Sequence, residues 1–330
     1  MYDGRMSEAL RVGLVGLGIH GQRYAGHLLK DVAGARLQAV CRSQVQAGEA
    51  FARRHKVKFF ADWRHLVADP LVEAVAVVTP PSLTPDVVRA ALRAGKPVLA
   101  EKPLAASGAA GRGLRRVVAK TGTSLMVAQT MRWDETVAAL KSHLDRVGKI
   151  RLMAIAQRLD PAQRSWLDSE AGGDVLLNTG VHAFDLLRYL SGEEVEQVWC
   201  RTRVLDTQKQ ACSFVAGMTL TGGILATVDN CRVTGGRSGR IEVVGEKGVL
   251  SADHVQGTLT CQEGQKSKAL KVNANVPTVR AVLEDFVQVV RGRKPVPVGL
   301  EDGLRAVEIA LACRRSARLG GTVRLKVEPA

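Results

Sequence analysis

The chain has 330 residues, of which 46% are hydrophobic, 24% charged and 4% aromatic, and it carries a formal net charge of +15. This composition is typical of a globular protein of about two domains, and it excludes collagen-like, coiled-coil and disordered classes. The basic residues are scattered and aromatic residues are few, so we expect no nucleic-acid partner, and no apolar run is long enough to cross a membrane.

Residues 1–130 alternate short β-rich apolar runs with helical stretches. The expected strands cover residues 12–15, 36–41, 57–60, 74–78, 98–100 and 124–127. The expected helices cover residues 21–30, 44–54, 85–94 and about 108–120, the third with Thr84 as N-cap and Pro85 at its first position. Strand–helix alternation with such short connections predicts an α/β domain built on a doubly wound parallel sheet.

The pattern changes in residues 131–330. The expected helices there cover about residues 135–146, 173–190, 278–291 and 300–318. The expected strands cover about residues 150–158, 195–204, 212–220, 223–230, 240–244, 249–252 and 322–327. Turn segments such as Gly245-Glu246-Lys247-Gly248 separate these strands, which predicts an α+β domain with a mostly antiparallel sheet.

The six cysteines form no C-x-x-C pair, and no histidine lies at metal-ligand spacing from them. They are typical of reduced, mostly buried thiols, and we expect no metal site. The N-terminal segment carries Asp3 and Glu8 before a short apolar run, which is not the pattern of a signal peptide. We therefore expect a cytoplasmic protein.

The segment Gly16–Gly21, with the sequence Gly-Leu-Gly-Ile-His-Gly, follows the first expected strand and opens the first expected helix. The first glycine permits the tight turn, the second lets the backbone approach a pyrophosphate, and the third packs the helix against the strand. Free N–H groups at the helix N-terminus then bind the phosphates. The expected cofactor contacts in this loop are Gly16, Gly18, Ile19, His20 and Gly21.

The second expected strand ends at Cys41 and continues with Arg42 and Ser43, where an NAD-specific fold usually has an acidic residue. A guanidinium and a hydroxyl both bind a 2′-phosphate, whereas a carboxylate repels it. We therefore expect Arg42 and Ser43 to bind the cofactor, which favours NADP(H) and leaves NAD(H) as the alternative. A capping box formed by Ser43 and Gln46 at the next helix is compatible with the same residues.

Lys102 follows the strand expected at 98–100, within the segment Glu101-Lys102-Pro103. Ligands of parallel sheets bind at the carboxyl ends of the strands, so the Lys102 ammonium is placed to hydrogen-bond a substrate oxygen beside the nicotinamide. A solvated surface lysine next to a proline turn is the alternative.

At 100° per residue, Asn178, His182 and Asp185 fall within an arc of roughly 60° on the helix expected at 173–190. Apolar residues cover the opposite side of this helix: Leu176, Leu177, Phe184 and Leu187. We expect the polar trio to face solvent or a polar cleft, where a histidine can take or give a proton. A hydrogen-bonded structural histidine is the alternative.

Taken together, these segments resemble the Gfo/Idh/MocA oxidoreductase family over nearly the whole chain. The resemblance rests on Gly16–Gly21, Thr79–Ser82, Ala94–Lys96, Glu101–Pro103, Val127–Trp133, Gly172–Asp185 and Glu301–Leu304. It implies an NAD(P)-binding Rossmann domain at residues 1–130 and, at residues 131–330, a domain with a large open sheet that binds a carbohydrate or polyol substrate. It also implies a homo-oligomer, a dimer or tetramer, that associates through this sheet.

The same resemblance implies roles for single residues. Lys102 and His182 are the expected catalytic pair, with Lys102 also beside the cofactor. The residues expected beside the nicotinamide are Thr79, Pro80 and Glu101. The residues expected at the substrate are Asn178, Arg132 and Asp185, the last also as the partner that fixes His182.

Three positions depart from the family pattern. Asn178 stands where the family commonly has aspartate, Thr84 where it commonly has histidine, and Arg42-Ser43 where many members have an acidic residue. Because asparagine does not ionise, Asn178 can orient a substrate but cannot act as a base.

We therefore expect an NADP(H)-preferring oxidoreductase that interconverts a secondary alcohol and a ketone on a sugar, sugar derivative or polyol. Two other classes are compatible with the same residues: an NAD-dependent glycosidase of the same fold, and a non-catalytic NADP-binding sensor or interaction protein. Specificity is expected on the loop 160–171, where Arg164 and Trp166 either contact the substrate or simply pack.

Overall fold

The computed structural model describes residues 9–161, 174–205 and 210–327 and divides the chain into two compact units. The first unit comprises residues 1–105, 109–128 and 277–302, and the second comprises residues 106–108, 129–276 and 303–330. Residues 277–302 lie inside the second domain expected from the sequence, yet they pack with the first unit. Hydrogen bonds from Val127 N–H to Val298 O and from Arg291 to Gly34 O attach them there.

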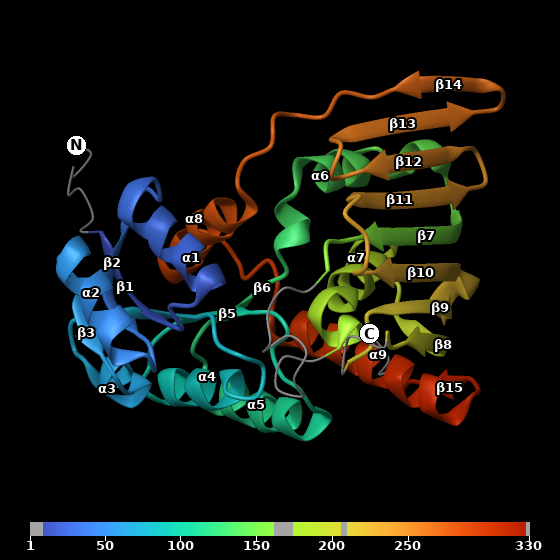
Figure 1. Cartoon of the computed structure of the whole chain (residues 1–330). Helices are drawn as coiled ribbons and strands as arrows, with labels where there is room; N and C mark the ends of the chain where they lie inside the picture. The colour runs from blue at the N-terminus through green and yellow to red at the C-terminus, as the bar shows by residue number, and fades with distance from the viewer. Residues whose placement is uncertain (1–8, 162–173, 206–209, 328–330) are drawn as a thin grey trace. The chain divides into compact units, whose positions relative to one another are not determined.

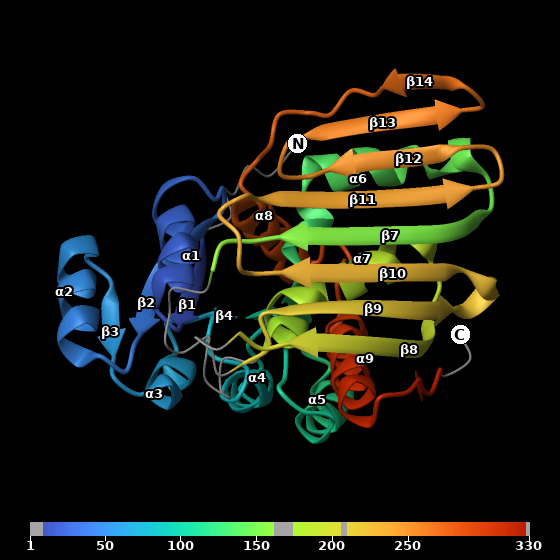
Figure 2. The same cartoon turned by 45° about the vertical axis from the view of Figure 1, so that its right-hand side comes forward.

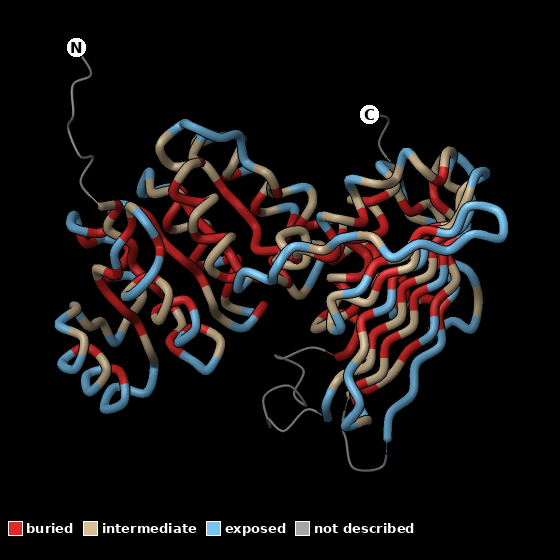
Figure 3. Tube along the Cα trace, turned by 90° about the horizontal axis from the view of Figure 1, so that it is seen from above, coloured by how far each residue is buried: buried red, intermediate tan, exposed pale blue. Residues whose placement is uncertain are grey.

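The first unit is built on a six-stranded parallel sheet with the strand order β3-β2-β1-β4-β5-β6. Its strands are β1 (Leu10–Val15), β2 (Ala35–Cys41), β3 (Lys58–Phe60), β4 (Ala74–Val77), β5 (Val98–Glu101) and β6 (Leu125–Ala128). The three strands β4, β5 and β6 are buried at every residue, as expected for a parallel sheet covered on both faces (Figure 3). The predicted doubly wound sheet is confirmed.

Helices cover both faces of this sheet (Figure 1). They are α1 (Ile19–Lys30), α2 (Val45–His55), α3 (Trp63–Ala68), α4 (Thr84–Arg93), α5 (Gly108–Thr121) and α8 (Thr278–Val290). In Figure 1, α1 and α8 lie above the sheet and α3, α4 and α5 lie below it. The short helix α3 was not expected from the sequence; Asp62 caps it by accepting a hydrogen bond from Arg64 N–H.

Two helix starts differ from the predicted ones. Helix α2 begins at Val45 after Gln44, and no side-chain hydrogen bond caps it, so the capping box of Ser43 and Gln46 is wrong. Helix α4 begins at Thr84, which makes Leu83 the N-cap residue. The Thr84 hydroxyl instead donates back to the turn before the helix.

The second unit is built on a nine-stranded sheet with the order β14-β13-β12-β11-β7-β10-β9-β8-β15. Its strands are β7 (Ile150–Arg158), β8 (Val195–Arg203), β9 (Ser213–Leu220), β10 (Leu225–Cys231), β11 (Ser238–Gly245), β12 (Val249–Asp253), β13 (Thr258–Glu263), β14 (Lys266–Ala269) and β15 (Val323–Arg324). All neighbours are antiparallel except β7 and β10. The mostly antiparallel sheet is confirmed, whereas β13 and β14 were not expected and β15 is shorter than predicted.

One face of this sheet carries the helices (Figure 2). They include α6 (Glu135–Ser142), α7 (Val181–Ser191) and α9 (Leu300–Leu319), with the 3₁₀ turns η1 (Thr130–Trp133) and η2 (Leu144–Val147) and the π-helical turn η4 (Leu176–Gly180). A further 3₁₀ turn, η5 (Thr221–Gly223), joins β9 to β10. Phe214, Ala216 and Met218 of β9 alternate with more exposed residues, so they join the core under the helices. None of the elements in the described ranges covers the opposite face.

No helix among the described residues combines the length and the apolar character needed to cross a bilayer.

Candidate functional site

The four segments that we expect to contact the cofactor all lie at one edge of the parallel sheet. Val15 of β1 is in register with Cys41 of β2 and Val77 of β4, and Val77 is in register with Ala100 of β5. The glycine loop, Arg42, Thr79 and Lys102 follow these strands. Because the chain continues to β2 on one side of β1 and β4 lies on the other side, this is the topological switch point where such sheets bind ligands.

The glycine loop has a backbone that fits a pyrophosphate. Gly16 adopts a φ of +100°, and an added Cβ there would lie 2.1 Å from Val78 O. An added Cβ at Gly21 would lie 1.8 Å from Gly16 O, so the fold itself requires both glycines. At Gly18 an added Cβ would meet nothing within 4 Å. The fold therefore does not demand glycine at position 18, whereas close approach of a phosphate does.

The N-terminus of α1 follows directly on this open backbone. Gly18 is its N-cap residue and no side chain caps the helix, so the first N–H groups are not occupied by a cap. Ile19, the first residue of α1, is 59% exposed. An anion-binding helix start with an exposed apolar residue beside it fits a dinucleotide, and the residues present therefore match the implied cofactor.

Arg42 and Ser43 lie at the end of β2, as predicted. Arg42 is half-buried and its guanidinium donates to Gln44 Oε1 at 2.5 Å, while Ser43 is exposed. Since the segment 41–45 contains no carboxylate, its charge suits a phosphate group.

Glu101, predicted beside the nicotinamide, is buried and hydrogen-bonded within the first unit. It is 5% exposed, and its Oε1 atom accepts a hydrogen bond from Tyr24 OH at 2.5 Å and lies 2.7 Å from His20 Nε2. Its Oε2 atom accepts from Lys102 N–H at 3.0 Å. Glu101 is thus enclosed by residues of its own unit, and its place beside the nicotinamide stays a prediction.

The same cluster sets the ionisation of its members. Burial works against the charged form of Glu101, but the hydrogen bond and charge of His20, followed by the charge of Lys102 and the Tyr24 hydrogen bond, outweigh it and lower the pKa of Glu101. Burial and the Glu101 charge raise the pKa of Tyr24 well above its ordinary value. Sequence reasoning missed Tyr24, which lies 77 residues before Glu101 in the chain and carries no motif of its own.

Thr79 and Pro80 form the turn between β4 and α4. The Thr84 hydroxyl donates to the carbonyl oxygens of Thr79 and Pro80 at 3.1 and 3.2 Å, and it lies 2.9 Å from Thr79 Oγ1. Thr84 thus holds the turn in place of the histidine common in the family. Thr79 and Lys102 remain half-buried and Pro80 exposed at this edge.

In the second unit, Arg132 and Asp185 form a bidentate ion pair. Arg132 Nε and Nη2 donate to the two carboxylate oxygens of Asp185 at 2.8 and 2.7 Å. The Asp185 side chain is fully buried and that of Arg132 is 10% exposed, and the Arg132 guanidinium also lies over the ring of Tyr189. Asp185 exposes no side-chain surface and holds Arg132, while its predicted places at the substrate and as the partner of His182 stay predictions.

Asn178 and His182 are half-buried and lie on consecutive elements, η4 and α7. Val181 N–H donates to Leu176 O, five residues back, so this segment is a π turn and not the continuous α-helix predicted at 173–190. The 100° arithmetic holds from His182 to Asp185 within α7 but does not apply across this turn, and Asp185 is buried whereas Asn178 and His182 are half-buried.

Two further polar residues next to this turn were missed. Asn230 of β10 and Gln157 of β7 are 1% and 6% exposed, and Asn230 Nδ2 donates to Gln157 Oε1 at 2.8 Å and to Thr179 Oγ1 at 3.0 Å. Both residues occupy core-facing positions of alternating strands: Gln157 continues Met153 and Ile155. A polar residue at a core-facing position was the signal that could have found them.

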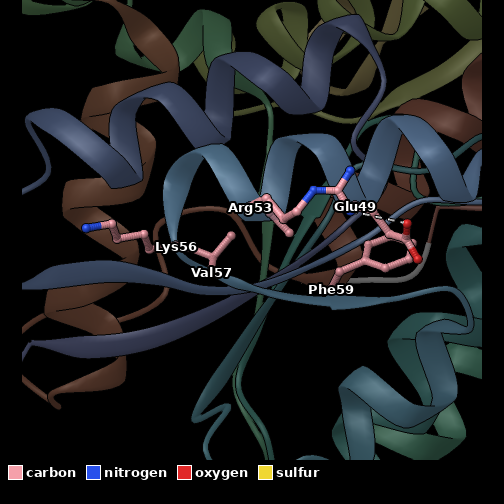
Figure 4. A pocket seen from close by; sticks show the side chains of 6 residues that line it. Glu49, Arg53, Lys56, Val57 and Phe59 are labelled. Atoms are coloured by element: carbon pink, nitrogen blue, oxygen red, sulfur yellow. Dashed lines mark ion pairs between the residues drawn. The ribbon is translucent and has the colours of Figure 1, made fainter.

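A separate hollow of about 480 Å³ lies on α2 and β3 (Figure 4). Its lining residues are Glu49, Ala52, Arg53, Lys56, Val57 and Phe59. Arg53 pairs with Glu49 across it at 3.6 Å. None of the predicted cofactor residues lines it, so it is not the site described above.

Arg164 and Trp166, predicted on the specificity loop, lie outside the described residues. Within the described ranges, no group of three or more His, Cys, Asp or Glu side chains gathers as it would around a metal ion.

Comparison with known proteins identifies the family. Residues 10–129 match the family described as "Oxidoreductase family, NAD-binding Rossmann fold", and residues 139–325 match its C-terminal alpha/beta domain. A myo-inositol 2-dehydrogenase of Thermotoga maritima is 29% identical, covering 96% of this chain and 99% of its own length. The scyllo-inositol 2-dehydrogenase (NAD(+)) of Bacillus subtilis is 26% identical, covering 98% of this chain and 99% of its own.

The fold agrees with this match. The crystal structure of a probable dehydrogenase from Thermotoga maritima is similar with a TM-score of 0.82 at 27% identity, covering 96% of this chain and 98% of that one. The chain therefore belongs to the Gfo/Idh/MocA family of oxidoreductases, with an NAD-binding Rossmann domain and an α/β C-terminal domain.

Proposed function

We propose that this protein is an NADP(H)-preferring oxidoreductase that interconverts a secondary alcohol and a ketone on a polyol, sugar or sugar derivative. The observation that carries the proposal is the shared sheet edge: Lys102 follows β5 at the edge where Gly18 leaves the backbone open. Two similar enzymes are named as inositol dehydrogenases, which supports a cyclic polyol as the first substrate to test.

Lys102 and His182 divide the chemistry in this proposal. The nicotinamide cofactor, when bound, accepts or donates the hydride. His182 takes the proton of the substrate hydroxyl during oxidation and returns it during reduction. Lys102 donates a hydrogen bond to the same oxygen and stabilises its developing negative charge. Arg132, held by Asp185, and Asn178 orient the substrate.

The test is an activity assay with myo-inositol, scyllo-inositol and a panel of sugars, using each oxidised cofactor and following its reduction by absorbance. Alcohol-dependent cofactor reduction that the His182→Gln variant loses supports the proposal. Release of the aglycone from a chromogenic glycoside without net cofactor reduction identifies a glycosidase instead. Tight cofactor binding with no turnover on the panel identifies a non-catalytic sensor. This class is tested because Asn178 replaces the aspartate common in the family.

The cofactor preference rests on Arg42 and Ser43. Titration of NADP⁺ and NAD⁺ into the protein should show tighter binding of NADP⁺, and Arg42→Asp should reverse the preference because a carboxylate then repels the 2′-phosphate. A charge-assisted hydrogen bond of about 1.5–3 kcal/mol corresponds to a change of about 10- to 100-fold in relative affinity. Equal binding of both cofactors to the unmodified protein contradicts the preference.

Asn178 provides a test of the residues proposed to act on the substrate. A carboxylate near His182 favours the charged imidazole, so Asn178→Asp should raise the pKa of His182 and move the pH–rate profile toward higher pH. The two side chains are similar in size, so the fold should be kept. A profile identical to that of the unmodified protein would place Asn178 outside the reacting groups.

We also propose that the uncovered face of the nine-stranded sheet joins copies of this chain into a dimer or tetramer. Leu152, Trp199, Val215 and Leu225 lie on four adjacent strands and are 37–55% exposed. An apolar area spread over four strands is typical of an association surface. Sedimentation analysis should show an oligomer that Leu225→Glu dissociates; a monomeric unmodified protein contradicts the proposal.

A further inference from the structure

The π turn η4 lies in the segment of the second unit that carries the residues proposed to bind the substrate. It carries Asn178 and Thr179, and it immediately precedes the helix α7 that carries His182. Single π turns inside helices are rare and occur frequently at functional sites, because the wider turn re-aims the side chains around it. What holds this turn in shape therefore bears on how Asn178 and His182 are presented.

Thr179 connects the turn to the sheet. Its hydroxyl accepts a hydrogen bond from Asn230 Nδ2 at 3.0 Å and donates to Val175 O at 2.9 Å. Asn230 in turn is fixed by Gln157 Oε1 at 2.8 Å, across the parallel pair of strands β10 and β7. The hydroxyl thus ties one residue of the turn to two neighbouring strands.

The two ends of the turn are also fixed. Asp174 accepts hydrogen bonds from Leu177 N–H at 3.1 Å and from Arg314 Nε of α9 at 3.0 Å. At the other end an added Cβ on Gly180 would lie 3.1 Å from the rings of Phe184 and Phe214. With its ends held by a charge pair and by ring packing, the turn has Thr179 as its polar contact to the sheet.

The buried amide of Asn230 is costly as a purely structural residue. Its Oδ1 atom is buried and accepts no hydrogen bond from any residue that the structure describes. An open buried acceptor destabilises a fold, and an apolar residue at this core-facing position would avoid that cost. An apolar residue would, however, lose the Nδ2 group, which donates to both Gln157 and Thr179.

We propose that Thr179 and Asn230 are positioning residues, which hold the π turn and thereby fix Asn178 relative to His182 during the reaction. This inference rests on the proposed function of His182 and Asn178. Neither Thr179 nor Asn230 touches the reacting atoms in the proposal. Their effect passes through the shape of residues 176–182.

The kinetic test uses Thr179→Val, which keeps the shape of the side chain and removes the hydroxyl. Displacement of a reacting group by about 1 Å can cost about 100-fold in rate, so we expect kcat to fall about 10- to 100-fold. The Kd of NADP⁺ should stay within about twofold, because the cofactor residues belong to the other unit. Thr179→Ser restores the hydroxyl and should recover most of kcat.

A matched control is Thr260→Val on β13. Thr260 also donates from its hydroxyl to a main-chain oxygen, that of Ser251 at 3.3 Å, in the same sheet. This variant should retain kcat. If Thr260→Val lowers kcat as much as Thr179→Val does, the effect reflects general loosening of the sheet and the positioning role is overturned.

A second test does not depend on activity. It measures amide hydrogen exchange in the peptide that covers residues 175–182. Thr179→Val and Asn230→Ala should each speed exchange in this peptide, and the double variant should add little to either alone because both remove one bond. If exchange is unchanged, or if the effects of the two substitutions add, the hydrogen bond between Asn230 and Thr179 does not hold the turn and the proposal is overturned. Faster exchange with unchanged kcat overturns the positioning role. If the unmodified protein is inactive on every substrate, the proposed function is overturned. The exchange measurement still decides whether Asn230 and Thr179 hold the turn.

Discussion

In each unit a proposed catalytic side chain has a buried carboxylate close to it in the sequence, but the two carboxylates are held in different ways. Glu101, next to Lys102, receives its contacts from Tyr24, from His20 in the glycine loop and from the Lys102 backbone. Asp185, three residues after His182, has both oxygens bound by Arg132. Both carboxylates join separate chain segments, Glu101 through hydrogen bonds to several groups and Asp185 through its bidentate pair with Arg132.

This difference predicts how each unit responds to substitution. In the first unit the loss of one donor leaves Glu101 other partners, so stability should change moderately. In the second unit the loss of Arg132 breaks a bidentate ion pair with a fully buried carboxylate, so stability should change more. In the proposed function, catalysis should depend on both units, because Lys102 belongs to the first unit and His182 to the second.

The largest expected effect is that of Lys102→Ala on turnover. Loss of a group that stabilises developing charge on oxygen typically lowers kcat by about 10²- to 10³-fold. NADP⁺ affinity, measured by titration, should remain within a few-fold, because the glycine loop and Arg42 are unchanged. Lys120→Ala, at an exposed position of α5, is the matched control and should keep full activity. Turnover of Lys102→Ala equal to that of the control would remove Lys102 from the mechanism.

Arg132→Ala should cause the largest loss of stability. It leaves the carboxylate of Asp185 buried without the arginine that binds both of its oxygens, and breaking a buried ion pair in this way costs about 3–5 kcal/mol. The free energy of unfolding, measured with urea, is the readout. The double variant Arg132→Met with Asp185→Leu removes both charges and should recover much of the loss. A loss below about 1 kcal/mol for Arg132→Ala would contradict the assignment of this pair as an anchor.

The two units also differ in how far the sequence predicts them. The central strands β1, β4 and β5 are mostly apolar runs between turns, and parallel strands bring their carboxyl ends together, so the edge with Gly16, Arg42, Thr79 and Lys102 could be predicted. The contact of Tyr24 with Glu101 could not, because it joins residues 77 positions apart through packing that no local pattern encodes.

In the second unit the sequence identified the right helix but not its geometry. Asn178 and His182 were recognised as polar residues on an apolar segment, but a π turn depends on tertiary contacts such as the bond between Asn230 and Thr179. The edge strand β14 was missed because it is exposed throughout and shows no apolar alternation. Its neighbour β13 was missed because its alternation rests on Leu259 and Cys261 alone.

Tyr24→Phe should have a smaller effect on stability, and one that depends on pH. The pKa of Glu101 is lowered in the fold, so its contribution to stability is fully present above the ordinary carboxyl pKa of about 4.3 and is lost as pH falls through the folded value. Removing the Tyr24 hydroxyl takes away one donor to a charged group, which costs about 1.5–3 kcal/mol near neutral pH. Urea unfolding from pH 7 downward should show the difference from the unmodified protein shrinking as Glu101 takes up a proton.

The control for this prediction is Tyr189→Phe. The described contacts of Tyr189 run through its ring, under Arg132 and Lys141, and through its carbonyl oxygen. The free energy of unfolding of the Tyr189→Phe variant should differ little from that of the unmodified protein at any pH in this range. A loss for Tyr24→Phe that is the same at pH 7 and at low pH would mean that the hydroxyl packs without supporting the Glu101 charge.

Gly18→Ala should have the smallest effect on stability and still weaken cofactor binding. Gly18 has a φ of −76° and space around its absent Cβ, so alanine fits without strain. Alanine is a poorer N-cap than glycine but restricts the unfolded chain, and these opposing terms leave a net change within about 0.5 kcal/mol. In contrast, Gly21→Ala would force a Cβ to within 1.8 Å of Gly16 O and should destabilise the fold itself.

Titration of NADP⁺ into Gly18→Ala should show affinity reduced about tenfold, equivalent to about 1.4 kcal/mol, because the methyl group occupies the space of the pyrophosphate. Unchanged affinity together with unchanged stability would show that the cofactor does not approach the backbone at this glycine.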